Sequence, residues 1–447
     1  MNFELLSIIL VLSFSFYLWI GNKSSKNIKS SDDYYLSSRN IGVFPLLMTF
    51  VATQVGGGVL IGTADIAYNN GSQVLYYPLG VALGLVALGM GIGQKYKEMG
   101  ISTTAEIFEK YFGSRLQRQI ASFFSIASLF LILAAQIIAL RKLFFVINVD
   151  ITWIFPFFWG TIVLYTVMGG FKAVVYTDMV QAGFIIIVLL VSFYLSTGSV
   201  ESSFNQAVDF ESMEKSIPWI DWMLMPFCFI LIEQDMAQRC FSSAKKSYVK
   251  IATFGSAFLV IICALISVYY GSLAKLYSLE ISENTSVIVT SVSYFGGKTI
   301  ATFFVSAIFM AILSTCDSLL CSISSNIFSD FIPEKLKSNK KSIFFAKVIT
   351  GIVGISCYFT SLFFSDVITP LLLAYEMSVS LFFMPIMCVV FNIKINKNTV
   401  WTMIALSIIG YIIGNLSGYS GPIISIIVSL CVILLHYIIN NFHKKYI

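Results

Sequence analysis

Residues 50–62 read Phe-Val-Ala-Thr-Gln-Val-Gly-Gly-Gly-Val-Leu-Ile-Gly and lie within an apolar run long enough to cross a membrane. Each glycine weakens a helix by about 1 kcal/mol relative to alanine, so three together predict a break in the middle of the span. Close helix packing would explain a single glycine. Three glycines beside Gln54 favour a broken helix, whose freed carbonyl and amide groups need a cation, a solute or a neighbouring helix as partner.

The whole chain is as apolar as this segment requires. It has 447 residues, of which 57% are hydrophobic and 11% are charged. Soluble domains carry about 25% charged residues, so the composition excludes an ordinary soluble protein. The net charge of +5 comes from basic residues scattered among loops, which gives no footprint for nucleic acid. The eight cysteines form no Cys-x-x-Cys pair and are expected to be buried thiols.

Apolar runs of about 20 residues recur along the chain, and each is long enough for one transmembrane helix. We therefore predict an all-α integral membrane protein with about thirteen transmembrane helices. The expected helices lie near residues 3–20, 43–69, 74–94, 119–146, 151–169, 178–198, 219–237, 251–274, 297–325, 342–364, 368–391, 400–416 and 421–441.

The placement of lysine and arginine predicts how these helices are oriented in the membrane. With alternating loops, 23 of the 28 basic residues fall on one side. The other side keeps Arg141, Lys142, Lys215, Lys275 and Lys298. Because basic loops face the cytoplasm, we expect the amino terminus outside and the carboxyl terminus in the cytoplasm. The short loops favour the inner membrane of a bacterium.

A second unusual segment, residues 310–322, places hydroxyl groups inside the membrane. It reads Met-Ala-Ile-Leu-Ser-Thr-Cys-Asp-Ser-Leu-Leu-Cys-Ser, and a helix at about 100° per residue aligns Ser314, Thr315 and Ser318 on one face. Asp317 lies at the edge of this face. An aspartate at the membrane centre costs about 2.5 to 3.5 kcal/mol and indicates a functional site. Oxygen ligands of this kind suit a hard cation.

A third segment, residues 169–181, reads Gly-Gly-Phe-Lys-Ala-Val-Val-Tyr-Thr-Asp-Met-Val-Gln and opens another predicted helix. Thr177 and Asp178, followed by Gln181, supply what a helix cap requires. An ion-binding role for Asp178 fits the same spacing equally well.

These three segments resemble the sodium:solute symporter family, which includes proline, pantothenate, sialic acid and sodium/glucose carriers. Further points of likeness are Asp-Tyr-Tyr-Leu at residues 33–36 and the run from Gln234 to Arg239. The likeness extends over roughly residues 30–391 and lies in the order, spacing and membrane depth of these short motifs.

The resemblance implies a leucine-transporter-type fold with an inverted five-plus-five helix repeat. Residues 1–42 would form an extra amino-terminal helix and a cytoplasmic loop, and residues 43–198 the first repeat. Residues 199–391 would form an extracellular loop and the second repeat, followed by two peripheral helices in residues 392–447. Solute and ion would meet near the midplane between the repeats.

The resemblance also implies which residues bind Na⁺. The family's main sodium site corresponds to the backbone carbonyls of Ala52, Val55 and Ala311 and the hydroxyls of Ser314 and Thr315. Some members have a second sodium site, which corresponds to Asp178, Ser314, Asp317 and Ser318. The carboxylate of Asp317 could equally carry a proton.

The helices expected to line a solute pocket carry several polar and aromatic side chains. These candidates are Gln54, Gly56, Gly57, Gly58, Tyr76, Tyr77, Gln136, Trp222 and Phe227. Glu233, Asp235 and Arg239 are interpreted as an inner gate or as interfacial ion pairs.

The favoured interpretation is a secondary active transporter that imports a small organic solute with sodium across the lipid bilayer. A proton-coupled carrier on the same fold remains an alternative, with Asp317 or Asp178 as the proton site. A membrane sensor without transport is disfavoured by the lack of a soluble signalling segment. An intramembrane enzyme is disfavoured because the two histidines, His436 and His443, form no catalytic or metal-binding pattern.

Overall fold

The computed structural model describes residues 2–26, 28–146, 151–197, 218–281, 286–337, 341–363 and 368–446. Apart from one isolated bridge between Ile41 and Ser243, the secondary structure of these residues is helical. The α-helices are α1 (Phe3–Ser25), α2 (Ser31–Leu36), α3 (Val43–Gln54), α4 (Thr63–Asn70), α5 (Tyr76–Ala87), α6 (Gly93–Met99), α7 (Glu106–Phe112), α8 (Arg115–Val146), α9 (Ile151–Thr197), α10 (Trp219–Ile232), α11 (Gln234–Ser242), α12 (Lys246–Leu276), α13 (Val287–Asn326), α14 (Glu334–Lys337), α15 (Ser342–Thr360), α16 (Ile368–Val390), α17 (Lys397–Leu416) and α18 (Gly421–Tyr446). Short turns of π-helix lie at Gly58–Gly62, Leu88–Ile92 and Ile327–Phe331, and 3-10 turns at Ser37–Arg39, Gly71–Leu75 and Ser361–Phe363.

The all-helical membrane architecture predicted from the sequence is confirmed, but the count of thirteen spans is not. Within the described residues, 10 helical stretches are long and apolar enough to cross a membrane, and two shorter apolar helices, α3 and α10, accompany them. The longest stretches cover 42, 44 and 45 residues. A single crossing needs about 20 residues, so length alone cannot count the crossings within these stretches. The predicted extracellular loop that begins at residue 199 lies largely outside the described residues.

Two glycines interrupt the longest helices. Gly170 divides α9 with a φ of +55°, and Gly297 divides α13 with a φ of +76°. At Gly170 a Cβ atom would lie 2.5 Å from the backbone oxygen of Tyr34, so both backbone angle and space require glycine. Each long helix therefore consists of two segments joined at a sharp bend.

The second part of α9 already begins after Gly170, so the predicted helix cap at Thr177 and Asp178 is wrong. The hydroxyl of Thr177 donates to the carbonyls of Ala173 and Val174 inside the helix.

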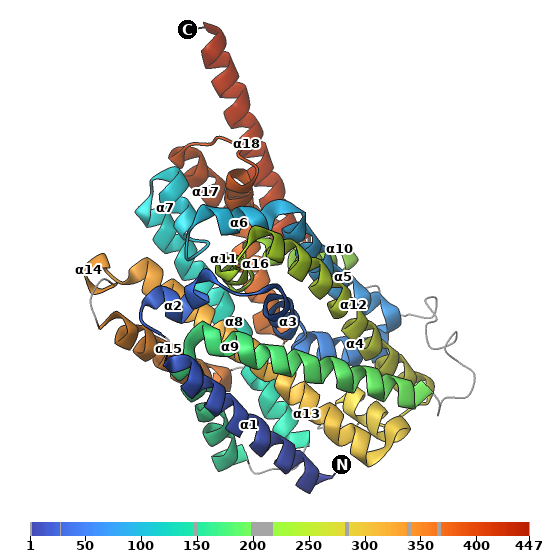
Figure 1. Cartoon of the computed structure of the whole chain (residues 1–447). Coiled ribbons are helices and arrows are strands. Elements are labelled where there is room, and N and C mark those ends of the chain that lie inside the picture. The colour runs from blue at the N-terminus through green and yellow to red at the C-terminus, as the bar shows by residue number, and fades with distance from the viewer. Residues whose placement is uncertain are drawn as a thin grey trace.

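Helix α13 forms the centre of the molecule, and the terminal helices lie at its periphery. In α13, 83% of the most apolar window is buried, compared with 17% in α1 and 28% in α18. Figure 1 shows α13 running between α8 and α9, whereas α18 projects from the body at its carboxyl end. The hydroxyl-rich helix is thus surrounded by protein.

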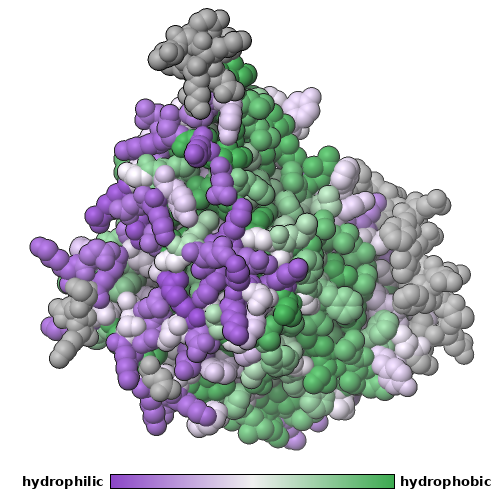
Figure 2. Space-filling model, turned by 45° about the horizontal axis from the view of Figure 1, so that its top comes forward, coloured by the Kyte–Doolittle hydropathy of each residue, from purple (hydrophilic) through white to green (hydrophobic). Residues whose placement is uncertain are grey.

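The surface separates polar and apolar residues. Figure 2 shows hydrophilic residues gathered on one part of the surface and a continuous hydrophobic area beside them. Large exposed side chains include Phe157, Ile187 and Tyr194 along α9 and Leu434 on α18. An apolar surface of this extent is expected where lipid surrounds a protein.

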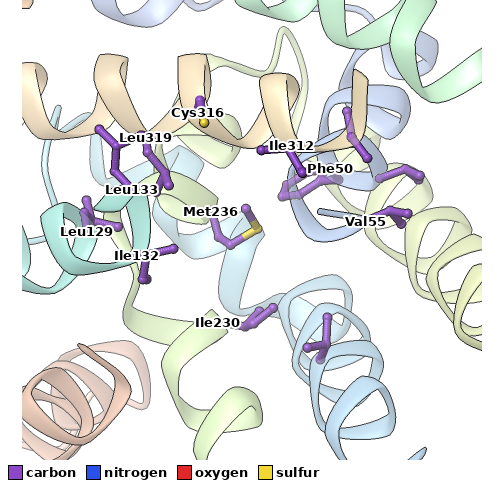
Figure 3. Packing of buried hydrophobic residues seen from close by; sticks show 14 of the residues in the cluster. Phe50, Val55, Leu129, Ile132, Leu133, Ile230, Met236, Ile312, Cys316 and Leu319 are labelled. Carbon is purple, nitrogen blue, oxygen red and sulfur yellow. The ribbon is translucent and has the colours of Figure 1, made fainter. Parts of the chain in front are cut away.

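The core joins segments that are far apart in the sequence. Figure 3 shows Phe50 of α3, and Val55 directly after this helix, near Ile312 of α13. Met236 of α11 lies between Ile132, Ile230 and Leu319. Ile132 is 6% exposed, and each of the other residues named here is at most 5% exposed. This packing holds the ends of α3 and α10 close to the middle of α13.

Candidate functional site

The first helix break lies where the glycines predicted it. Helix α3 ends at Gln54, and Val55 has φ −86° and ψ 61°, outside the helical range. The chain resumes a π turn at Gly58, which continues into α4. The break therefore exposes backbone carbonyl groups at the end of α3 in the interior of the protein.

A second helix break lies at Glu233, where the sequence suggested one continuous helix over residues 219–237. Helix α10 ends at Ile232, Glu233 is extended with φ −63° and ψ 134°, and α11 begins at Gln234. Carboxylates at Glu233 and Asp235 inside an apolar run were the available signal for this break. The prediction of a continuous helix is wrong, and the two broken helices face the same cavity described below.

Two hydroxyl groups of α13 meet the end of α3. The Oγ atom of Ser314 lies 2.8 Å from the carbonyl oxygen of Ala52 and 2.9 Å from that of Ala311. The Oγ1 atom of Thr315 lies 3.2 Å from the carbonyl oxygen of Thr53 and 3.1 Å from that of Ala311. Four of the groups predicted to bind sodium are therefore brought together around the break.

Val55, the remaining predicted sodium ligand, is buried at the end of the same helix. The next residue, Gly56, packs directly on α13, because a Cβ atom there would lie 2.7 Å from Oγ1 of Thr315. Carbonyl and hydroxyl oxygens are the ligands that hard cations prefer. The cluster has the donor atoms that a sodium ion requires.

A buried arginine occupies the region of the predicted second cation site. The guanidinium of Arg239 donates to Oγ of Ser318 at 2.6 Å and lies 3.5 Å from a carboxylate oxygen of Asp178. It also donates to Thr53 and to the carboxylate of Asp235. Arg239 and both aspartates are fully buried. These residues form a central network rather than an interfacial ion pair near the inner end of a helix.

Asp317 lies apart from the guanidinium group. Its Oδ2 atom accepts a hydrogen bond from the hydroxyl of Tyr165 at 2.6 Å, with Oγ1 of Thr177 3.4 Å away. Its Oδ1 atom has no hydrogen-bond partner among the described residues. The predicted second site is therefore divided, with Asp178 and Ser318 on Arg239 and Asp317 on Tyr165.

A cavity of about 40 Å³ lies between the two helix breaks. Five of the residues predicted to contact solute line it, namely Gln54, Gly56, Gly58, Tyr77 and Gln136. Thr315 lines it as well, so the hydroxyl cluster and the cavity share a wall. The cavity also contains residues that the sequence analysis did not place there, namely Phe229, Glu233, Asp235 and Tyr375.

The other predicted pocket residues do not line this cavity. Gly57 lies behind it, and its amide donates to Oε1 of Gln136 at 3.4 Å. Tyr76 packs on Trp219, with ring centroids 5.9 Å apart, and Trp222 packs against an apolar cluster elsewhere. Phe227 is partly buried in the main core. Successive residues on a helix point in directions about 100° apart, so Tyr77 faces the cavity where Tyr76 does not. Phe229, two residues after Phe227, points about 200° away from it and lines the cavity.

The chain matches the model of the sodium:solute symporter family over residues 34–410. Among curated proteins it is 25% identical over 366 residues to the high-affinity choline transporter 1 of Drosophila melanogaster, covering 76% of this chain and 58% of the fly protein. It is 24% identical to the human high affinity choline transporter 1, covering 83% of this chain and 69% of that protein. The sodium/pantothenate symporter of Haemophilus influenzae is 26% identical, with 74% of this chain and 73% of that protein covered.

Solved structures show the same fold. A sodium-coupled sialic acid symporter in a substrate-bound, outward-open state superposes with a TM-score of 0.79 at 18% identity, covering 97% of each chain. A nucleobase-cation-symport-1 family transporter in a closed conformation gives a TM-score of 0.63 at 14% identity, covering 92% of this chain and 95% of that chain. At these identities the likeness concerns the arrangement of the helices.

Proposed function

Because the chain belongs to the sodium:solute symporter family, we propose that it is a secondary active transporter that imports a small organic solute together with sodium. The relatives are named for choline, pantothenate and glucose, so their names alone do not select one solute. Solute and sodium cross the membrane without covalent change, so no catalytic residue is required.

The observation that carries this proposal is the meeting of α3 and α13. Ser314 and Thr315 contribute hydroxyl oxygens, and Ala52 and Ala311 contribute carbonyl oxygens, at a break beside a cavity. We place the sodium ion among these oxygens, with the carbonyl of Val55 as a further ligand. Because Thr315 borders both places, bound sodium would order the wall of the solute cavity.

Coupled transport follows if sodium and solute each favour binding of the other. Coupling energies between two sites are typically about 1–3 kcal/mol. We propose that residues 43–198 and 199–391 form the two inverted repeats and that their rocking exposes the site to each side in turn. A negative-inside potential adds about 2.3 kcal/mol per charge for each 100 mV, which drives sodium and solute inward.

The charges around the site favour one sodium ion in the conformation described. The guanidinium of Arg239 already lies between Asp178 and Ser318, where the second cation was expected. A second sodium there would meet a like charge at close range, so Arg239 would have to move first. Asp317 keeps an unpartnered oxygen and is the candidate for a proton site in a proton-coupled alternative.

The proposal is tested by thermal unfolding of the purified protein in detergent, with sodium exchanged for potassium at constant ionic strength. A ligand that binds only the folded state stabilises it by about 2.7 kcal/mol at a hundred times its dissociation constant. We expect sodium to raise the unfolding midpoint of the native protein and to have little effect on Ser314→Ala.

Ser306→Ala is the matched control for this experiment, because Ser306 is a buried serine of α13 whose hydroxyl donates to the carbonyl of Thr302 in its own helix. It should keep the sodium response. Equal responses of the native protein and Ser314→Ala would contradict the sodium site. An unfolding midpoint of the native protein that does not change with sodium but changes with pH would favour proton coupling at Asp317.

A further inference from the structure

The solute cavity contains a carboxyl group that has no basic partner among the described residues. Glu233 lies at the break between α10 and α11, is 8% exposed and lines the cavity. No described residue donates a side-chain hydrogen bond to it or forms an ion pair with it. An ionised carboxylate held away from water in this way is costly without a positive partner.

The nearest positive charge is already shared by other carboxylates. Arg239 forms ion pairs with Asp235 and with Asp178, and both are fully buried. Asp235 also accepts from the hydroxyl of Ser322 at 3.0 Å. One guanidinium thus faces two carboxylates before Glu233 is counted, and the region between the broken helices has an excess of negative charge.

The residues lining the cavity include no positively charged side chain that would attract an anion. They include Glu233 and Asp235 and no lysine, arginine or histidine. A solute that carries a carboxylate or a phosphate would therefore meet only repulsion from the charged groups of this cavity. A positively charged solute would supply the missing partner of Glu233.

Three aromatic rings line the same cavity as this carboxyl group. Tyr77, Phe229 and Tyr375 line the cavity together with Glu233. The hydroxyls of Tyr77 and Tyr375 are 3.3 Å apart, and the rings of Phe229 and Tyr375 have centroids 4.6 Å apart. The faces of such rings attract organic cations, and groups of them recognise alkylated ammonium ions.

The rest of the lining is largely apolar, with Val81, Ile132, Ile230 and Leu319 among its residues. These side chains suit alkyl groups and cannot accept hydrogen bonds from the several N–H groups of a primary ammonium. The apolar wall therefore favours a head group whose charge is covered by carbon.

We propose that the solute is a small organic cation with an alkylated ammonium head, bound between Glu233 and the rings of Tyr77, Phe229 and Tyr375. This inference rests on the proposed transport function and names its substrate class. Glu233 supplies the counter-charge, the rings supply cation–π attraction, and sodium at the adjacent cluster fixes the wall formed by Thr315.

The test uses a pair of probes that differ in charge alone. Choline and 3,3-dimethyl-1-butanol have nearly the same shape, but only choline carries a positive charge. With sodium at saturation, we expect choline to raise the unfolding midpoint of the full-length protein in detergent, and the neutral alcohol to have little effect. Pantothenate, an anion, should also have little effect.

Variants then locate the charge. Glu233→Gln should need at least about tenfold more choline for the same shift while keeping the sodium response, since the neutral amide removes the negative charge that attracts the ammonium group. Glu98→Gln is the matched control, because Glu98 is an exposed carboxylate that pairs with Lys246. It should keep the response to both sodium and choline.

A second pair of variants covers the case in which Glu233→Gln does not fold. Tyr375→Leu removes the ring and Tyr375→Phe keeps it, so the leucine variant should lose more choline affinity than the phenylalanine variant. A normal sodium response with no choline effect, or with equal effects of choline and the neutral alcohol, would overturn the inference and leave sodium binding intact. Loss of the sodium response in the native protein would instead contradict the proposed function.

Discussion

At the scale of single residues, Arg239 connects more of the interior than any sodium ligand does. Its guanidinium contacts Thr53 at the end of α3, Asp178 in α9, Asp235 in α11 and Ser318 in α13. A buried guanidinium is costly to remove from water, and here carboxylates and hydroxyl groups offset that cost. The residue therefore ties both broken helices to the central helix.

Removing this charge should destabilise the protein strongly. Arg239→Gln leaves Asp178 and Asp235 without a cation, and breaking a buried ion pair in this way costs about 3–5 kcal/mol. The measurement is the midpoint of thermal unfolding in detergent, in the absence of sodium.

A double variant distinguishes the ion pair from simple loss of packing. Arg239→Gln combined with Asp178→Asn should recover part of the lost stability, because one of the stranded charges is then absent. Strictly additive losses in the double variant would show that Arg239 and Asp178 do not interact.

At the scale of helices, close packing positions the second break. Helices α5 and α10 lie against each other at Gly80 and Gly84. A Cβ atom on Gly80 would lie 2.2 Å from the backbone oxygen of Met223, so the two backbones touch directly. This contact places α10, and with it Glu233, beside Tyr77.

Gly80→Ala should push α5 and α10 apart. The clash is with backbone atoms, which cannot rotate away, and overpacking of this kind costs about 1–3 kcal/mol. Gly183→Ala is the control, since a Cβ atom there meets nothing within 4 Å in the middle of α9. Unfolding midpoints should fall for Gly80→Ala and hold or rise for Gly183→Ala; equal midpoints would contradict the close contact.

The sequence predicted one helix break and missed the other for a physical reason. The break after Gln54 is preceded by no special signal, but the following glycines weaken any helix that continues through them. Glu233 adopts φ −63° and ψ 134°, which every residue can adopt, so that break needs no glycine or proline. Gly170 and Gly297 have positive φ, which glycine adopts readily, but the sequence analysis predicted no break at either residue.

The candidate site likewise contains residues that the sequence predicts and residues that it does not. Ser314, Thr315 and Ala311 share one helix face, so their grouping follows from helix periodicity, and the likeness to a known family supplied their partner Ala52. The location of Arg239 and Tyr375 depends on how α11 and α16 pack across the molecule, which no local pattern contains. Of the aromatic candidates, Tyr77 lines the cavity, whereas Tyr76, Trp222 and Phe227 do not, because the sequence does not give the rotation of each helix about its axis.

At the scale of the whole molecule, the chain is a multi-pass membrane protein whose orientation is a prediction. Lys394 lies before α17 and Lys397 is its first residue, whereas the turn between α17 and α18 contains no basic residue. The positive-inside rule places the first segment in the cytoplasm and the turn at residues 417–420 outside.

Cysteine labelling in intact cells checks this orientation. Lys394 is exposed, and Tyr419 is 72% exposed, so Lys394→Cys and Tyr419→Cys place thiols on opposite ends of α17. A Cys431→Ser background removes the exposed native thiol, and the other cysteines are buried. A membrane-impermeant maleimide should label Tyr419→Cys and spare Lys394→Cys until the cells are opened. The reverse pattern would invert the orientation.

The helix break at Val55 also bears on how this protein can vary over generations. The ligands that we assign to Ala52, Val55 and Ala311 are main-chain oxygens, which every amino acid possesses. Exchanges of the side chain at these positions leave the ligand atom in place, provided that the backbone keeps its course. Substitution of Gly56 is more restricted, because an added methyl group would collide with the side chain of Thr315. Related proteins could therefore differ widely in amino-acid sequence at these ligand positions and still bind the ion through the same oxygen atoms.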